Sequence, residues 1–235
     1  MQRISKLSTI IATCALLSTP VLAQGGNGNG GNGGQGGQGG NGVIMAYIDT
    51  LPLEQIDAVE LADLDHMRQE EKLARDTYLM LYGSSGLNIF NNIAQAEQSH
   101  MDLTLAIYNR YGLIDPLLSD DIGVFPDPAF TTLFRRMVTF GRQSNLHALW
   151  IGAIIEDLDI YDLDGALART DNRDIAVVWQ NLARGSRNHM RAFYGQLQNL
   201  GVTYMGIWLP NWRILDIVNT PVENQPVDEN GVVLP

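Results

Sequence analysis

The segment that decides the fold is IAQAEQSH, residues 93–100, in the middle of a helical stretch. Its glutamate, Glu97, is followed three residues later by His100, and positions three apart share one helix face. Ile89 and Ile107 lie on the same face, so this carboxylate and this imidazole should point into a core. A buried carboxylate is costly unless it is paired or bound to a cation. The segment therefore predicts a metal site inside a bundle of helices.

Apolar residues recur every three or four positions along four long stretches, as they do in helices that bury one face. No stretch shows the sustained alternation of a strand. Four long helices, with a longer link between the second and the third, predict an all-α, ferritin-like four-helix bundle with a short extra helix in that link. The expected helices run from about Leu53 to Tyr82, Asn88 to Tyr111, Pro128 to Phe140, Ser144 past Ile160, and Asp171 to Leu200.

The first 23 residues have the pattern of a cleaved secretory signal. Arg3 and Lys6 precede an apolar run, and the segment ends in Val-Leu-Ala. It is too short and wrongly flanked for a permanent membrane span. The only cysteine, Cys14, lies inside it, and an alternative reading as a lipidated cysteine is disfavoured by Thr13. We therefore expect a secreted or periplasmic protein whose mature chain has no thiolate ligand.

Composition divides the remaining chain into three parts. Residues 24–42 contain only Gly, Asn and Gln, with 12 glycines among 19 residues, and we expect a flexible linker. Residues 43–219 should form the single ferritin-like domain. Residues 220–235 are rich in Pro, Asn and acidic side chains, and we expect a disordered tail without a role in the core.

The charge of the chain restricts its partners. Two of the 15 basic residues lie in the signal, so 13 basic residues face 26 acidic ones in the mature chain. Such a surface disfavours nucleic acid and anionic lipid, and it favours cations. The expected partners are metal ions and small oxidants, peroxide or dioxygen; assembly into a homo-oligomer is left open.

Residues that can bind metal fall on the inward stripe of every long helix. One glutamate from each of two helices and Glu-x-x-His from the other two would build a di-iron or di-manganese centre. Carboxylates can bridge two cations, and neutral imidazoles complete the coordination. The candidates are Glu71 on the first helix, Glu97 and His100 on the second, Glu156 and Asp159 on the third, and His189 on the fourth.

Each candidate also has a simpler interpretation. Glu71 could be solvated beside Glu70, Asp159 could end its helix, and a single histidine such as His189 is more often a hydrogen-bonded core residue. His66 and His147 have no partner at a suitable spacing, and we expect them to be structural or exposed. The joint pattern on four helices, rather than any one residue, favours a metal site.

Two motifs add a family resemblance. Residues 71–78, EKLARDTY, resemble the first-helix motif of rubrerythrins, in which the Glu is a ligand and the Tyr, here Tyr78, lies against the site. Residues 93–100 are similar to the second-helix motif of those proteins. The stretch from Arg68 to Gly201 resembles a ferritin-like family catalogued as a domain of unknown function, and IEDLDI (155–160) and RGSRNHMRAF (184–193) carry the match. The resemblance implies two iron ions, with manganese or zinc as alternatives.

The chain also departs from the rubrerythrin pattern. Glu-x-x-His on the fourth helix would need glutamate at position 186, where this chain has Ser186. Asp159, three residues after Glu156, occupies the place of a second carboxylate on the third helix. The four-cysteine rubredoxin module is absent from the sequence, so electron delivery within the chain is not available.

Two hypotheses follow from these patterns. The first is an exported oxidoreductase of the ferroxidase or peroxidase type, with Tyr78 as the catalytic side chain beside the metals. The second is a non-catalytic metal-binding or interaction bundle of the cell envelope. Reactivity of the bound metal toward oxygen or peroxide distinguishes them.

Overall fold

The structure is a computed structural model, and it describes residues 37–235. In this part of the chain there are seven helices and no strand, apart from one isolated antiparallel bridge between Val227 and Val233. The helices are α2 (Gly37–Ile48), α3 (Ala58–Ser85), α4 (Asn88–Tyr111), α5 (Pro128–Gly141), α6 (Asn145–Leu167), α7 (Arg173–Asn199) and α8 (Asn211–Asn219).

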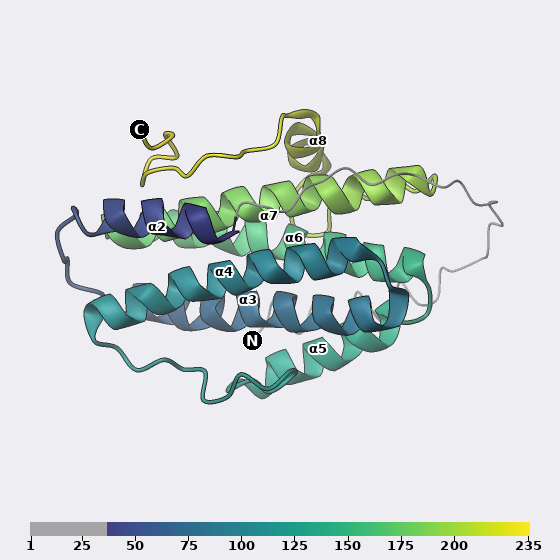
Figure 1. The fold of residues 1–235 in the computed structure, drawn as a ribbon, viewed down its shortest axis with the longest axis horizontal. Helices are drawn as coiled ribbons and strands as arrows, with labels where there is room; N and C mark the ends of the chain where they lie inside the picture. The colour runs from purple at the N-terminus through teal and green to yellow at the C-terminus, as the bar shows by residue number, and fades with distance from the viewer. Residues whose placement is uncertain (1–36) are drawn as a thin grey trace.

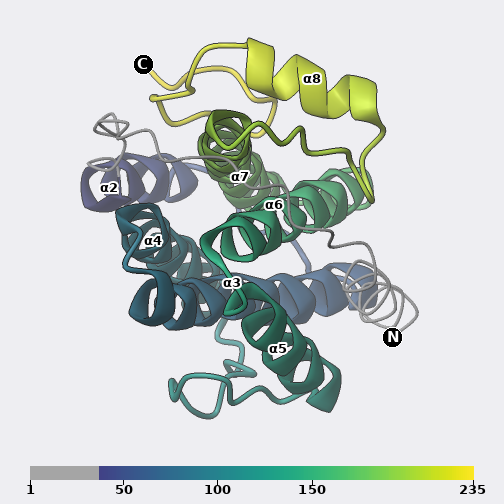
Figure 2. The ribbon, with the colours of Figure 1, turned by 90° about the vertical axis from the view of Figure 1, so that its right-hand side faces the viewer.

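The four long helices form two hairpins that pack on each other. Helix α3 lies along α4, and α6 lies along α7 (Figures 1 and 2). Helix α5 packs against α3 and α6, α2 lies against α4 and α7, and α8 covers α7. An all-helical bundle with a short helix in the link between its two hairpins is therefore confirmed.

Capping residues set the helix ends. The Asp57 side chain accepts hydrogen bonds from the backbone amides of Val59 and Glu60, and the Glu60 side chain accepts one from the Asp57 amide. This reciprocal box starts α3 at residue 58, so the expectation of a start near Leu53 is wrong. Gly86, with φ of 68°, ends α3 in the left-handed conformation that glycine adopts without strain.

The core consists of two apolar clusters at different heights of the bundle. One contains Tyr78, Phe90 and Phe193, and the other contains Leu64 and Trp179. Each of the four long helices contributes to both clusters. On three helices buried polar side chains lie between the two sets of positions: Glu71 on α3, Glu97 and His100 on α4, and Ser186 and His189 on α7. On α6, Glu156 and Asp159 lie among the last residues that this helix contributes to the first cluster. The candidate ligands therefore form a polar layer where the two apolar clusters adjoin.

The structure corrects the expectations for both chain ends. The linker was expected to reach Gly42, but α2 begins at Gly37, inside that linker. Ile44 and Ile48, which follow the glycines, are buried in the second apolar cluster, and Asn41 donates a hydrogen bond to the Ser99 carbonyl. Tertiary burial therefore outweighs the low helix propensity of glycine here. The expected signal segment, residues 1–23, lies outside the described residues.

The expectation of a disordered tail is also wrong, because residues 220–235 run along α7 (Figure 1). The Asn181 side chain donates to the Val227 carbonyl at 2.7 Å and accepts from the Val227 amide at 3.0 Å. The Glu223 carboxylate accepts hydrogen bonds from Arg187 and Arg191. The composition of the tail did not reveal this docking because the partner side chains, Asn181, Arg187 and Arg191, belong to α7.

Within residues 37–235, no helix combines the length and the apolar character that crossing a membrane requires.

Candidate metal centre

Five of the predicted ligands meet in the polar layer. They form two groups of three that share Glu97, and within each group one ligand atom per residue lies within 4.8 Å of the others. One group joins Glu97 and His100 of α4 to Glu71 of α3, and the second joins Glu97 to Glu156 of α6 and His189 of α7. All five residues are buried.

Glu97 lies between the two imidazoles. Its Oε2 is 2.8 Å from Nδ1 of His100, and its Oε1 is 3.0 Å from Nδ1 of His189. The Glu71 Oε2 atom is 3.1 Å from the same nitrogen of His100, and the Glu156 Oε2 atom is 3.4 Å from that of His189. Each imidazole therefore faces two carboxylates, and only Glu97 faces both imidazoles.

A glycine on α7 makes room for one of the two rings. A Cβ atom at Gly185 would lie 2.3 Å from His100 Nε2, much closer than any real contact. The absence of a side chain at this position lets the Nε2–Cε1 edge of the ring approach the helix, while its Nδ1 atom faces the carboxylates. The two imidazole rings are 5.6 Å apart between centroids.

Tyr78 donates a hydrogen bond from its hydroxyl to Glu156 Oε1. Burial raises the pKa of Tyr78 well above its usual value, and the charge of Glu156 raises it further. The phenol therefore stays protonated and keeps its donor role. The other Glu156 oxygen remains turned toward His189, so Tyr78 fixes which carboxylate oxygen faces the centre.

Asp159 is buried in the same layer, and its Oδ2 atom accepts a hydrogen bond from Ser186. Its Oδ1 atom is buried and has no hydrogen-bond partner. Burial raises the pKa of Asp159 well above its usual value, and the charges of Glu71 and Glu70 raise it further. Asp159 therefore lies within electrostatic reach of the Glu71 side of the centre.

The centre carries an excess of acidic groups. Burial raises the pKa of Glu71 to about 7 although His100 opposes that shift, and burial also raises the pKa of Glu156. Burial would raise the pKa of Glu97 too, but the two imidazoles outweigh it and hold the value below the usual range. The neighbouring carboxylates overcome burial at His100 and raise its pKa to about 9. Without a metal, the imidazoles must hold protons to balance the carboxylates.

The basic residues near this layer of α3 are engaged elsewhere. Lys72 pairs with Asp76, and Arg75 pairs with both Asp76 and Asp120. None of these acidic partners belongs to the centre. A buried Glu71 oxygen, Oε1, also lacks a hydrogen-bond partner. Unpartnered carboxylate oxygens of Glu71 and Asp159, together with two imidazoles and two more carboxylates, fit divalent metal ions.

The sequence profile of DUF2202, described as an uncharacterized protein domain, matches residues 60–221. The chain belongs to the DUF2202 family. The matched region begins near the start of α3 and ends just beyond α8, so it contains all of the ligands above.

This DUF2202 domain has an archaeal relative. The uncharacterized protein MJ0754 of Methanocaldococcus jannaschii is 44% identical over 180 residues, which cover 77% of this chain and 97% of that protein. A crystal structure titled hypothetical protein MJ0754, from Methanococcus jannaschii DSM 2661, matches with a TM-score of 0.72 at 45% identity. That match covers 74% of this chain and 99% of the archaeal one. The similarity therefore extends over nearly the whole archaeal protein.

One further group of ligand-type side chains in this DUF2202 domain was missed from the sequence. His66, expected to have no partner at a suitable spacing, lies 3.3 Å from Glu70 and 3.4 Å from Asp162. The spacing of His66 and Glu70, four residues apart on one helix, was the available signal. His147, by contrast, is hydrogen-bonded to Ser144 at the start of α6 and stands apart from all of these groups.

Proposed function

We propose that this domain is a ferritin-like bundle that holds two metal ions, iron in the first place, and oxidises ferrous iron with hydrogen peroxide or dioxygen. The observation that carries the proposal is the position of Glu97, whose two oxygens face the imidazoles of His100 and His189 separately. A carboxylate between two nitrogen donors is the arrangement that a bridged pair of metals needs.

The roles of the side chains follow from their contacts. Glu97 would bridge the two ions, Glu71 and His100 would complete one position, and Glu156 and His189 the other. Asp159 would supply a fourth negative charge, so that four carboxylates balance two divalent ions. Tyr78 would orient Glu156 and hold a proton at its hydroxyl beside the reacting centre.

The metals would supply the electrons for the reaction, and the chain would supply a buried site for them. When bound, two ferrous ions supply one electron each, enough with two protons to reduce one hydrogen peroxide molecule to two of water. The chain keeps the metals buried, because the two apolar clusters that adjoin the polar layer exclude water from the centre. Manganese or zinc would suit the same ligands, but zinc would not support electron transfer.

The topology supports the ferritin-like assignment. The two hairpins, α3–α4 and α6–α7, are joined by a link that spans residues 112–144 and includes α5. In ferritin-like bundles a long crossover connects two helix pairs in this way. A secreted or periplasmic location, inferred from residues 1–23, remains part of the proposal.

The test is oxidation of ferrous iron loaded anaerobically into metal-free protein. Mixing with peroxide or dioxygen in a stopped-flow instrument should give faster ferric formation than the same iron in buffer. Glu156→Ala should remove the acceleration, while Glu54→Ala, a change at a side chain that is 38% exposed and outside the centre, should keep it.

The outcomes separate the two hypotheses of the sequence. Iron bound at the Glu97 centre but oxidised at the buffer rate would leave the non-catalytic metal-binding bundle. Failure to bind iron, manganese or zinc at Glu97 would overturn the proposed function and leave only the interaction bundle.

A further inference from the structure

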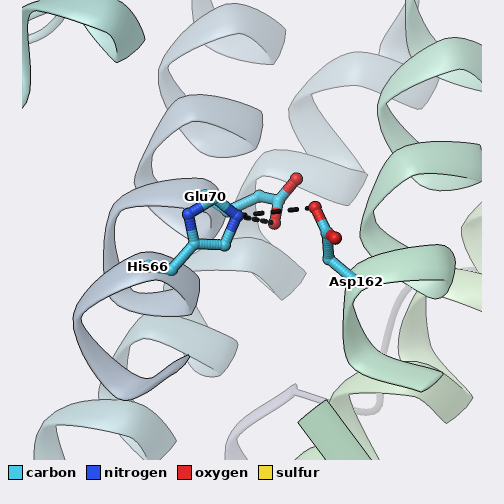
Figure 3. A group of neighbouring side chains, drawn as sticks. All are labelled: His66, Glu70 and Asp162. Atoms are coloured by element: carbon cyan, nitrogen blue, oxygen red, sulfur yellow. Dashed lines mark hydrogen bonds and ion pairs between the residues drawn. The ribbon is translucent and has the colours of Figure 1, made fainter. Parts of the chain in front are cut away.

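A second cluster of ligand-type side chains lies apart from the Glu97 centre. His66 and Glu70 project from α3, and Asp162 projects from α6 (Figure 3). The Nε2 atom of His66 lies 3.3 Å from Glu70 Oε2 and 3.4 Å from Asp162 Oδ2. The three ligand atoms lie within 4.8 Å of one another, the same closeness found in the two groups that share Glu97.

The two carboxylates are buried, and the imidazole connects them to the surface. The side chains of Glu70 and Asp162 are each 3% exposed, whereas that of His66 is 31% exposed. The His66 ring also contacts Phe130 of α5, with 5.4 Å between ring centroids. One nitrogen is thereby held toward the carboxylates, while part of the ring remains open to solvent.

The backbone gives this cluster a fixed relation to the Glu97 centre. Glu156, Asp159 and Asp162 occupy successive positions three residues apart on α6, and Glu70 directly precedes Glu71 on α3. The carboxylates of α6 therefore form a row that leads from the buried centre toward His66. Four residues separate His66 from Glu70, so both side chains point from the same face of α3.

We propose that His66, Glu70 and Asp162 form a mononuclear binding site for a divalent first-row transition ion. This site goes beyond the dinuclear centre of the proposed function and uses none of its ligands. One imidazole and two carboxylates suit zinc, manganese, ferrous iron and cobalt alike, and the exposed side leaves coordination positions for water. The proposed site lies at the end of the α6 row of carboxylates that is nearer to solvent.

The competing explanation is a protonated histidine. Burial opposes the charged form, but hydrogen bonds to Asp162 and Glu70 raise the pKa of His66 to about 10. An imidazolium between two carboxylates would satisfy the same geometry without metal. The experiment must therefore distinguish a proton from a metal ion on Nε2.

Zinc binding to the full chain distinguishes a metal ion from a proton at His66. Equilibrium dialysis of metal-free protein against zinc, followed by elemental analysis, should give three equivalents for the unmodified chain. His66→Ala should lose one equivalent, and His147→Ala, the matched control at a histidine outside every ligand group, should lose none. Equal zinc content in His66→Ala and the unmodified chain would overturn the site.

A second measurement does not depend on a variant that folds. The four histidines can be followed by nitrogen-15 correlation of their ring atoms during a zinc titration. Zinc should convert His66 from an imidazolium with two N–H groups to a ring with a metal-bound Nε2. A His66 ring that keeps both protons at saturating zinc would show that only a proton occupies the cluster.

Glu97→Ala separates this inference from the proposed function. If both sites exist, this variant should lose the two zinc ions of the centre and keep the one at His66. Loss of zinc in His66→Ala together with unchanged content in Glu97→Ala would support the mononuclear site and refute the dinuclear one. The reverse pattern would refute the mononuclear site alone.

Discussion

Ser186 of α7 donates a hydrogen bond to Asp159 of α6 across the polar layer. Ser186 stands where the rubrerythrin pattern would place a glutamate, and Asp159 stands where that pattern has a second carboxylate of the third helix. The residue that departs from the pattern, Ser186, therefore contacts the carboxylate that occupies the third-helix position. One oxygen of Asp159 is held by the serine, and the other is buried without a hydrogen-bond partner.

The contribution of Asp159 to metal binding can be tested by substitution. Asp159→Asn should lower metal occupancy at the position of Glu71 and His100 more than at that of His189, because the fourth negative charge is lost. Ser186→Ala, which removes the hydrogen bond but keeps the carboxylate, should lower occupancy less. Occupancies can be read from anomalous scattering of zinc-loaded crystals. Unchanged occupancy in Asp159→Asn would mean that this residue has only a structural role.

Removal of the shared carboxylate should have the largest effect on metal content. We expect Glu97→Ala to lose both ions of the centre and to remain helical. The unmodified protein should melt at a higher temperature with metal than without, since a ligand at a hundredfold excess over its Kd stabilises the folded state by about 2.7 kcal/mol. Elemental analysis and thermal circular dichroism measure the two effects. A Glu97→Ala protein with the metal content of the unmodified chain contradicts the bridging role.

The space around His100 can be tested with one methyl group. Gly185→Ala would place a Cβ atom 2.3 Å from His100 Nε2 and should displace the ring. We expect a loss of about 1–3 kcal/mol in unfolding free energy and weaker metal binding. Gly195→Ala on the same helix meets no atom within 4 Å, so it should be neutral or stabilising. Similar unfolding midpoints for the two variants in urea would argue against the close approach.

The hydroxyl of Tyr78 should matter for stability even without metal. Tyr78→Phe leaves Glu156 Oε1 without this donor in a buried setting, which should cost about 1–3 kcal/mol. Tyr82→Phe, at a side chain near the exposed end of α3, is the matched control and should change little. Urea unfolding of both metal-free variants gives the comparison. Retained stability together with slowed iron oxidation would assign Tyr78 to the reaction alone.

Docking of the tail should depend on pH through Glu223. Burial would raise the pKa of this carboxyl, but hydrogen bonds from Arg187 and Arg191 outweigh it and hold the pKa below its usual value. Its stabilising effect is therefore complete above the unfolded pKa, about 4.3, and is lost as pH falls through the lower folded value.

Hydrogen exchange measures that docking. Glu223→Gln should speed exchange of the tail amides at neutral pH, including the Val227 amide that is bonded to Asn181. The unmodified tail should approach the behaviour of the variant only in acid. Glu54→Gln is the control, because Glu54 contacts Arg173 at the start of α7 rather than Arg187 and Arg191. Equal tail protection in Glu223→Gln and the unmodified chain would rule out this anchor.

Helices with clear caps and periodic apolar faces could be predicted from the sequence. The bounds of α4 agree with the expected Asn88–Tyr111, and Asp127 and Ser144 cap α5 and α6. Local signals sufficed here because a cap and its partner amides lie within three residues of each other. Convergence of Glu71, Glu97 and His189 also followed from helical spacing.

Features that depend on distant partners could not be predicted. Asp157 is buried in α6 and accepts hydrogen bonds from the amides of Ile207 and Leu209. It thereby holds the segment before α8, some fifty residues later in the chain. Nothing in the local sequence distinguishes this aspartate from its exposed neighbour Asp164. The docking of α2 and of the tail was missed for the same reason.

The division of the core by a polar layer has a consequence for the order of assembly. Each apolar cluster already draws on all four long helices, so neither needs a metal ion to bring the helices together. The chain can fold around protonated histidines, and under the proposed function it would exchange those protons for cations afterwards. Under the proposed function, metal acquisition would then be a late step, governed by which ions surround the finished protein rather than by those present during its synthesis.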